Sequence, residues 1–424
     1  MHLVILTQYF RPETGAPQNR LEDLARRAVG EGHDVTVVTA MPNYPSGVVR
    51  EDYRKRLVLA EELDGVHVVR SWIHGHRGRG TLHQMVGYGS FAASSLVTAP
   101  FRLRRADVLL WESPPLFLAP TAELLARRLG ARLVMNVSDL WPETAVDLGM
   151  LSNQRLIRAF TAMARRAYRR SALVMGQTQG IIGGIEEVAP GTPTLLAPNG
   201  VDCRRLQPRP RDLDLAERLG IEPGVAVVGY AGNFGRAQAL GQVTAAARSL
   251  LARRQDTVVL LVGDGPVKSQ VIAEASDLDP ERFLIRPSVG ADEMPDLLGV
   301  IDIAVVPLAD QPIFEGARPS KMFEVLASGT PFVFCGRGEG ADLAADSGAA
   351  RVVPAEDPAA LASELGDLLD LSPTERGALG AAGRAWVETR FDRNVIGAEV
   401  MARLSDLTDQ PRTRCSVDRI RSDA

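Results

Sequence analysis

Residues 315–331 read EGARPSKMFEVLASGTP, a polar loop followed by a short amphipathic segment. Pro319 suits the first turn of a helix, because its φ is fixed and the N–H that it lacks has no partner there. Apolar residues follow at 322, 323, 326 and 327, the spacing of one helical face, and Gly329 is a typical C-terminal stop. The stretch therefore predicts a helix that starts at Pro319-Ser320-Lys321 and packs by one face.

The start of this helix carries groups that bind anions. The hydroxyl of Ser320, the ammonium of Lys321, the first backbone N–H groups and the positive end of the helix dipole all meet there. Glu324 lies one turn further on the same side, where it can accept hydrogen bonds from a hydroxyl pair such as a ribose. Lys321 is one of only three lysines in the chain. Two interpretations remain open: a nucleotide-diphosphate site, or a solvated lysine beside a surface carboxylate.

The composition is that of a soluble globular protein with more than one domain. The chain has 424 residues, of which 45% are hydrophobic and 24% charged. Its net charge of −4 argues against general nucleic-acid binding. Residues 1–200 contain 23 Lys/Arg and 18 Asp/Glu, a net +5, whereas the rest contain 25 and 34, a net −9. The N-terminal half is therefore the better candidate to meet an anionic surface or substrate.

The cysteines and histidines indicate neither a zinc site nor a disulfide framework. Cys203, Cys335 and Cys415 have no paired spacing, and all six histidines lie at or before His83. The N-terminus MHLVILTQYF lacks a basic lead and a cleavage site, which favours a buried first strand over a signal peptide. We expect a cytoplasmic protein without a metal or bound cofactor.

Short apolar, β-branched runs alternate with helical stretches along the chain, which predicts an α/β fold with parallel sheets. Two sets separated near residue 200 predict two doubly wound, Rossmann-like domains with a ligand cleft between them. We expect domains at 1–200 and 201–390, a helix at 391–408 and a disordered tail at 409–424. The expected strands are 3–6, 34–39, 66–71, 107–111, 132–137, 172–176 and 194–197, then 225–230, 258–262, 283–285, 303–307, 331–334 and 350–353.

Glycine-bearing loops follow the first strand of each expected domain. Gly15 lies in YFRPETGAPQNR, residues 9–20, and this loop is either a border of the cleft or an ordinary turn. In GYAGNFGRAQAL, residues 229–240, Gly232 and Gly235 would let backbone N–H groups approach a phosphate. The candidate side-chain donors of this second loop are Asn233, Arg236 and Gln238. Gly265, in the next turn Gly263-Asp264-Gly265-Pro266, would border the same site.

Two segments of the first half carry alternatives. Residues 84–101 are nearly uncharged and end against Arg102, Arg104 and Arg105, which indicates either a buried helix or a helix resting on an anionic bilayer. In NVSDLWPETAVDLGML, residues 136–151, Asp139 and Trp141 suit sugar hydroxyls and a pyranose face. The alternative for the second segment is a capped helix start with a buried tryptophan.

Taken together, PNGVD, GYAGNFGRAQAL, VGDGP and PSKMFEVLASGTP resemble a family-four glycosyltransferase of the GT-B fold, over essentially residues 1–408. RPETGAPQNR, SDLWPE and PSK are most similar to the transferases of bacterial surface-polysaccharide assembly, including N-acetyl-L-fucosamine transferases. This resemblance implies retaining transfer from a nucleotide sugar, most commonly linked to uridine diphosphate (UDP), without a required metal. It also implies a C-terminal helix that crosses back to the N-terminal, acceptor-binding domain.

The resemblance assigns roles residue by residue. Glu324 matches the second glutamate of the E-x7-E motif, the ribose ligand, whereas the first glutamate is replaced by Gly316 and Glu315 stands one residue early. Asn233 and Gln238 occupy the places of the usual arginine and lysine.

Other positions complete this comparison. Lys321, Arg236 and Arg318 remain as cations to balance a diphosphate, and Ser113 lies near the position of a histidine in many relatives. Asp139 matches the subgroup's acidic position. We therefore expect Asp139, Glu315 and Lys321 to act in catalysis.

The expected partners are a nucleotide-sugar donor and a glycan or lipid-linked acceptor, with peripheral contact to the inner face of an anionic membrane. Two rival functions remain. One is a sugar-nucleotide epimerase of the same fold, and the other is a non-catalytic partner subunit that retains the fold without a working donor site.

Overall fold

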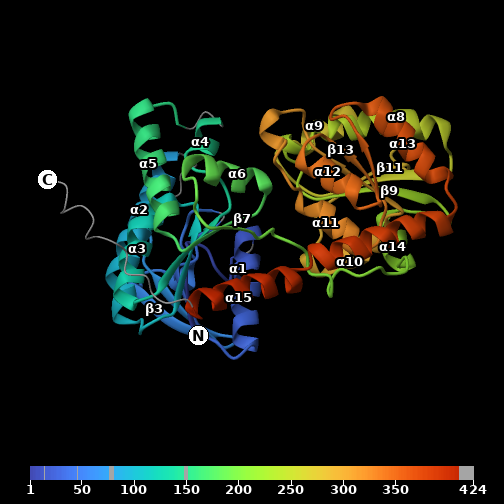
Figure 1. Cartoon of the computed structure of the whole chain (residues 1–424). Coiled ribbons are helices and arrows are strands. Elements are labelled where there is room, and N and C mark those ends of the chain that lie inside the picture. Colours follow the sequence, from blue (N-terminus) through green and yellow to red (C-terminus); the bar gives the residue numbers. More distant parts are fainter. Residues whose placement is uncertain (14, 45, 76–80, 148–150, 410–424) are drawn as a thin grey trace. The chain divides into compact units, whose positions relative to one another are not determined.

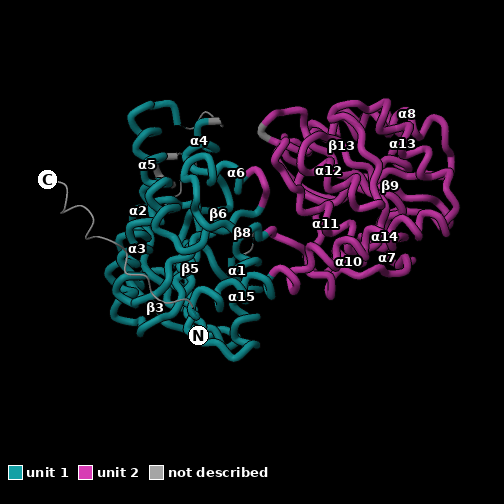
Figure 2. The backbone as a smooth tube through the Cα atoms, viewed as in Figure 1, with its two compact units in different colours: residues 1–177, 181–197, 397–424 teal, residues 178–180, 198–396 magenta. Residues whose placement is uncertain are grey.

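The computed structural model describes residues 1–13, 15–44, 46–75, 81–147 and 151–409, and the chain divides into two compact units. Unit 1 contains residues 1–177, 181–197 and those from 397 onward, and unit 2 contains residues 178–180 and 198–396 (Figure 1, Figure 2). Of the tail expected at 409–424, residues 410–424 lie outside the described residues.

Unit 1 is built on a sheet with the strand order β3-β4-β2-β1-β5-β6-β7-β8. Its neighbouring strands are parallel except for the antiparallel pair β3 and β4. The strands are β1 His2–Leu6, β2 Asp34–Ala40, β3 Val58–Leu63, β4 Val66–Ser71, β5 Val108–Ser113, β6 Arg132–Val137, β7 Leu173–Gly176 and β8 Thr194–Leu196. The helices are α1 Ala16–Gly30, α2 Thr81–Thr98, α3 Ala119–Leu129, α4 Glu143–Asp147, α5 Gln154–Arg170 and α6 Gln179–Val188.

The core of unit 1 explains why its central strands are so apolar. β1 lies between β2 and β5, so Ile5 stands opposite both Val37 and Leu110, and all three are fully buried. Side chains of one sheet face pack with Phe91 of α2 and Phe160 of α5 in one cluster. A parallel sheet covered on both faces requires such uninterrupted apolar strands.

Unit 2 contains a fully parallel sheet with the order β11-β10-β9-β12-β13-β14. Its strands are β9 Ala226–Ala231, β10 Thr257–Val262, β11 Phe283–Arg286, β12 Ile303–Pro307, β13 Phe332–Cys335 and β14 Ala350–Val353. The longer helices are α7 Leu213–Leu219, α8 Gly241–Arg253, α9 Lys268–Glu274, α10 Met294–Val300, α11 Ser320–Ala327, α12 Glu339–Asp346, α13 Pro358–Asp370 and α14 Pro373–Arg390. These elements confirm the predicted α/β fold of two Rossmann-like halves.

The last described helix, α15 Arg393–Asp409, begins in unit 2 and continues in unit 1 from Gly397. Gly397 faces α1 closely, because a Cβ built on it would lie 3.0 Å from Cδ of Arg27 (Figure 1). Further along the helix, Met401 and Leu404 are buried. The helix is therefore held to unit 1 by packing.

The helix predicted at 319–328 is confirmed. α11 starts at Ser320 after Pro319 as N-cap and ends before Gly329, whose φ of +70° is the left-handed conformation that glycine favours. Met322, Phe323 and Leu326 are buried in the core of unit 2.

The sequence prediction missed β3, which pairs antiparallel with β4 at the edge of the sheet. Asp64 and Gly65 form the connecting turn with φ of +52° and +79°. A two-residue Asp-Gly turn between alternating residues is a strong hairpin signal, so the sequence did contain the information.

Within the described residues, the helices are too short or too polar for any of them to span a bilayer.

Leu326→Ala should lower the unfolding free energy of unit 2 by about 2–5 kcal/mol, because the fully buried leucine side chain is replaced by a cavity. Leu213→Ala, at a leucine of the same unit that is 68% exposed, should change it by less than about 0.5 kcal/mol. Urea unfolding followed by intrinsic fluorescence measures both variants, and equal effects would contradict this assignment of the core.

Candidate functional site

The buried face of α11 fixes the position of its polar side chains. With residues 322, 323, 325, 326 and 327 packed into the core, Lys321 and Glu324 are left half-buried on one side of the helix. Both line a small cavity together with Gly229 and Ala231 of β9. The structure thus brings together two of the predicted site residues beside the first strand of unit 2.

Lys321 is a desolvated cation whose charge Glu324 offsets only in part. Its Nζ lies 5.4 Å from the ring centroid of Tyr230, and in the described part of the chain it has neither a hydrogen bond nor an ion pair. Burial lowers the pKa of this ammonium, and the charge of Glu324 offsets part of that effect. An isolated cation at low polarity is costly unless an anion joins it, so this site favours an anionic ligand.

Glu324 is held one helical turn away, in an environment that opposes its ionisation. Burial raises the pKa of its carboxyl, and the charges of Lys321, Arg393 and Arg205 lower it. Glu324 is therefore a poorly solvated acceptor that gains from hydrogen-bond donors such as ribose hydroxyls.

The glycines predicted to approach a phosphate pack tightly at the ends of β9 and β10. Gly232 N donates to Val262 O at 2.9 Å, and a Cβ on Gly263 would lie only 1.9 Å from Gly232 O. A Cβ on Gly232 would lie 3.0 Å from Cε of Lys321, and on Gly265 2.5 Å from Phe234 O. Gly232 and Gly265 have φ of +149° and +154°. Only glycine allows the two loops and the lysine to come this close.

The three predicted side-chain donors of the β9 loop differ in their surroundings. Asn233 and Arg236 are exposed. Gln238 is half-buried, and its Oε1 accepts a hydrogen bond from Gly235 N at 3.1 Å, so it holds the loop together. Tyr230 does the same with its hydroxyl, which donates to Asn233 O at 2.6 Å.

Arg318 was predicted as an available cation, but the structure gives it an acidic partner. Its Nε donates to Oε1 of Glu339 at 2.8 Å, and its guanidinium carbon lies 5.9 Å from the centroid of Phe391. A paired arginine has less charge to offer a diphosphate, because Glu339 already balances it. Arg318 therefore fixes the loop that leads into α11.

Glu315 and Ser320 lie at the surface. Oε1 of Glu315 accepts from Nε of Arg337 at 2.9 Å, an exposed pair, and its backbone O accepts from Glu339 N at 2.7 Å. Ser320 is exposed at the first position of α11. Glu315 would have to exchange its arginine before it could bind a sugar hydroxyl.

Unit 1 places a buried polar network at the carboxyl ends of β5 and β6, where parallel sheets bind ligands. Glu112 is 4% exposed and accepts hydrogen bonds from three side chains. Arg20 Nη2 donates to its Oε1 at 2.8 Å and to Ser138 Oγ at 2.9 Å, and Asn136 Nδ2 donates to its Oε2 at 2.6 Å. Ser138 Oγ also donates to Oε1 of Glu112.

Asp139 follows this network and retains exposed surface. Desolvation raises the pKa of its carboxyl, as does the charge of Glu112, whereas Arg20 lowers it. Trp141 is partly buried and packs edge-on against Phe160, with centroids 5.6 Å apart. Contact of this ring with a pyranose stays a prediction.

Gly15 is the N-cap residue of α1, and a glycine has no side chain that could cap the helix. The loop before it is held by Glu13, which is 6% exposed and accepts from Asn43 N at 2.6 Å and Tyr44 N at 2.7 Å. Glu13 is thus fixed to the segment at Asn43 and Tyr44.

Sequence reasoning missed Arg20, Glu112 and Tyr230. A carboxylate one residue before the end of VLLWES was a usable signal, because a charge on a fully buried strand requires a partner. Nothing local to Arg20 indicates that it is this partner, 92 residues away.

Two family models match the chain, one on each half. Residues 15–200 match the "Glycosyl transferase 4-like domain", and residues 225–371 match "Glycosyl transferases group 1". WcaI of Escherichia coli K12, described as a colanic acid biosynthesis glycosyl transferase, is 26% identical over 338 residues, covering 78% of this chain and 82% of its own. WbjE of Pseudomonas aeruginosa, described as a glycosyltransferase, is 24% identical and covers 69% of this chain and 73% of its own.

Solved structures show the same fold at lower identity. HepE of Anabaena, in complex with UDP and glucose, has a TM-score of 0.66 and 18% identity, covering 96% of this chain and 100% of its own. The trehalose-6-phosphate synthase OtsA has a TM-score of 0.71 at 12% identity, covering 96% and 99%.

The two α/β units, with their mostly parallel sheets, have the GT-B fold of these solved structures. With the family models matched on both halves, the chain belongs to the GT-B glycosyltransferases.

Glu112→Gln should destabilise unit 1 by about 3 kcal/mol, because it leaves the guanidinium of Arg20 buried without its charge partner. It should also lower the pKa of Asp139, since Glu112 is one of the groups that raise it. Thermal unfolding and carboxyl ¹³C NMR titration measure the two effects. Glu62→Gln, at an exposed position of β3, is the matched control and should change neither. An unchanged Asp139 pKa in Glu112→Gln would argue against the proximity of the two carboxyls.

Proposed function

We propose that this glycosyltransferase moves a sugar from a UDP-sugar to a glycan or lipid-linked acceptor with retention of anomeric configuration. Unit 2 is the donor unit in this proposal. The observation that carries it is the desolvated ammonium of Lys321, which has no hydrogen bond or ion pair among the described residues. A diphosphate supplies the negative charge that would neutralise this ammonium. The complex of HepE with UDP and glucose supports the choice of nucleotide.

Each part of the donor has a partner in the cradle. Lys321 and the first N–H groups of α11 bind the diphosphate, whereas the N–H groups of Gly232 and Gly265 already donate to Val262 O and to Oδ1 of Asp264. Glu324 accepts hydrogen bonds from the ribose hydroxyls. The exposed Asn233 and Arg236 lie on the same glycine loop and contribute further donors. No metal is required, because these groups already balance the diphosphate.

The chemical step breaks the bond between the anomeric carbon and the diphosphate oxygen, through an oxocarbenium-like state. The electron pair leaves with the diphosphate, whose growing charge Lys321 and the helix-end N–H groups stabilise. The acceptor hydroxyl oxygen forms the new bond, and Asp139 of unit 1 accepts the proton that this hydroxyl loses. Glu315 contacts the sugar hydroxyls after releasing Arg337.

The acceptor class is suggested by the relatives and by α2. WcaI is named for colanic acid biosynthesis, and WaaG, a structural neighbour with a TM-score of 0.66, is titled for lipopolysaccharide biosynthesis. We infer a role in polysaccharide assembly, with an N-acetylamino sugar among the candidate donors.

One face of α2 supports contact with a membrane. Phe91 and Ser95 bury the opposite face, while Val86 and Val97 are 48% and 65% exposed. Gly89 and Ala93 are exposed between them, so the outer face is uncharged over three turns. The exposed Phe101, Arg102, Arg104 and Arg105 follow, which suits an anionic bilayer surface.

Lys321→Met should weaken UDP binding by about 10–100-fold, because a charge-assisted hydrogen bond to the diphosphate is lost. Without UDP, the variant should be more stable than the parent by roughly 1 kcal/mol, because a desolvated charge is removed. The parent should gain about 2.7 kcal/mol at UDP concentrations 100 times the Kd.

Thermal shift and calorimetric titration measure both effects, with Arg218→Met, an exposed cation of the same unit, as control. In Lys321→Met, turnover should fall by about 10²–10³. Unchanged UDP affinity would overturn the donor assignment. A product of inverted configuration, read from its ¹H coupling constants, would overturn retention alone.

Arg104→Gln and Arg105→Gln should each weaken binding to anionic vesicles about fivefold, the equivalent of about 1 kcal/mol per arginine. Flotation with phosphatidylcholine vesicles, with and without phosphatidylglycerol, measures this. The exposed Arg218 and Arg253 of unit 2 provide matched Arg→Gln controls. Equal binding by both pairs of variants would contradict a role for the end of α2.

A further inference from the structure

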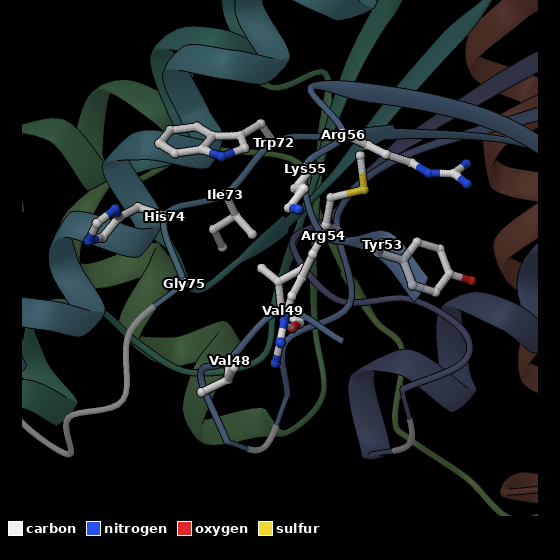
Figure 3. Close-up of a pocket in the computed structure, with 11 residues that line it drawn as sticks. Val48, Val49, Tyr53, Arg54, Lys55, Arg56, Trp72, Ile73, His74 and Gly75 are labelled. Atoms are coloured by element: carbon white, nitrogen blue, oxygen red, sulfur yellow. Dashed lines mark hydrogen bonds between the residues drawn. The ribbon is translucent and has the colours of Figure 1, made fainter. Parts of the chain in front are cut away.

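Unit 1 contains a second cavity, of about 400 Å³, that the proposed function does not use. This volume is within the ~300–1,000 Å³ range of small-molecule sites. Met41 lies directly after β2 and Trp72 directly after β4, so the cavity stands at the carboxyl ends of parallel strands. The segment from Val48 to Arg56 forms the facing wall (Figure 3).

The charge of this lining is of one sign. Arg54, Lys55 and Arg56 line the cavity with His74, and none of its described lining residues is acidic. Lys55 has no hydrogen bond or ion pair among the described residues, and its φ of +65° is unfavourable for a side chain larger than glycine. Figure 3 shows the guanidinium of Arg56 directed away from the other lining side chains.

The remaining lining is apolar and includes one large aromatic ring. Trp72 is 40% exposed, and its ring meets that of His74 edge-on at 6.2 Å. Figure 3 shows these two rings together, with Ile73 beside them. An aromatic ring and aliphatic side chains next to cations suit a ligand with an anionic group joined to a less polar body.

The walls are held by backbone hydrogen bonds. Trp72 N donates to Leu57 O at 3.0 Å and Arg50 N to Pro42 O at 3.0 Å. Ser94 of α2 donates to the carbonyl of Trp72, and His74 N donates to Oγ of Ser90 at 2.8 Å. Arg54 is anchored through Nε to Val49 O at 3.0 Å. The cavity is therefore a built feature that adjoins α2.

We propose that this cavity binds a phosphoryl group of the acceptor, a phosphate or diphosphate that joins the glycan to its carrier. The inference rests on the proposed function for the statement that unit 1 binds the acceptor. Lys55 has no ion pair among the described residues, and it stands beside Arg54, whose Nη1 lies 3.2 Å from Oε1 of the exposed Glu51. This excess of positive charge matches a multiply charged anion better than the single charge of a sugar carboxylate. The exposed apolar face of α2 lies next to the cavity, where a lipid carrier would emerge.

The test uses pyrophosphate and the fluorescence of Trp72, in the Lys321→Met background so that the donor cradle does not contribute. Pyrophosphate should quench the emission saturably, and Trp72→Phe should remove the response. Lys55→Gln should weaken the Kd about tenfold. Arg56→Gln is the matched control, because it removes the same charge at the next residue, whose side chain is directed away from the cavity (Figure 3). It should weaken the affinity for pyrophosphate less than about threefold.

Inorganic phosphate, glucuronate and anionic phospholipid vesicles separate the possible anions. Saturable quenching by pyrophosphate or phosphate, sensitive to Lys55→Gln, supports the proposal. Glucuronate binding as tightly as pyrophosphate, quenching by vesicles alone, or equal effects of Lys55→Gln and Arg56→Gln would overturn it. The stabilisation by UDP depends on Lys321 in the other unit, so its presence or absence reports on the donor assignment independently.

Discussion

The ammonium of Lys321 sits above the ring of Tyr230 with no ion pair among the described residues and with its charge only partly offset by Glu324. The rest of unit 2 can be understood from that constraint. α11 must bury its apolar face, and this packing carries Lys321 to the end of β9. Glycines at 232, 263 and 265 are needed because any Cβ there would strike the neighbouring loop or the lysine itself. The folded state thus tolerates an unfavourable charge whose environment improves when an anion enters.

In unit 1 the buried charge is negative, and it already has hydrogen-bond partners. Its buried carboxylate, Glu112, is satisfied by Arg20, Asn136 and Ser138, so the network rigidifies the ends of β5 and β6 without a ligand. The Asp139 that follows lies beside this network and has a raised pKa because of it. Around β2 and β4 the same edge of the sheet carries Lys55, which has no ion pair among the described residues, and Arg54, which pairs with the exposed Glu51. We therefore look there for the charged part of the acceptor.

Individual residues show where sequence reasoning reached its limit. The strands and α11 were predictable, because buried parallel strands are uninterrupted apolar runs and a helix repeats its apolar residues every three to four positions. β3 was missed because an edge strand buries only one face, although its Asp-Gly turn was readable. Arg318 and Gln238 were expected to meet the ligand, yet Glu339 and the Gly235 amide already bind them. A local pattern specifies a side chain's chemistry but not its partner.

The sequence by itself determined the fold class, the start of α11 and the glycines that must approach a neighbour, since these depend on local periodicity and backbone freedom. Only the tertiary structure decided which charges are balanced. The Arg20–Glu112 pair spans 92 residues, and Arg318–Glu339 joins a loop to a separate helix. That Lys321 has no hydrogen bond or ion pair among the described residues likewise becomes visible only when everything around it is in place. Burial and pairing are properties of positions in space, and the cost of a charge depends on both.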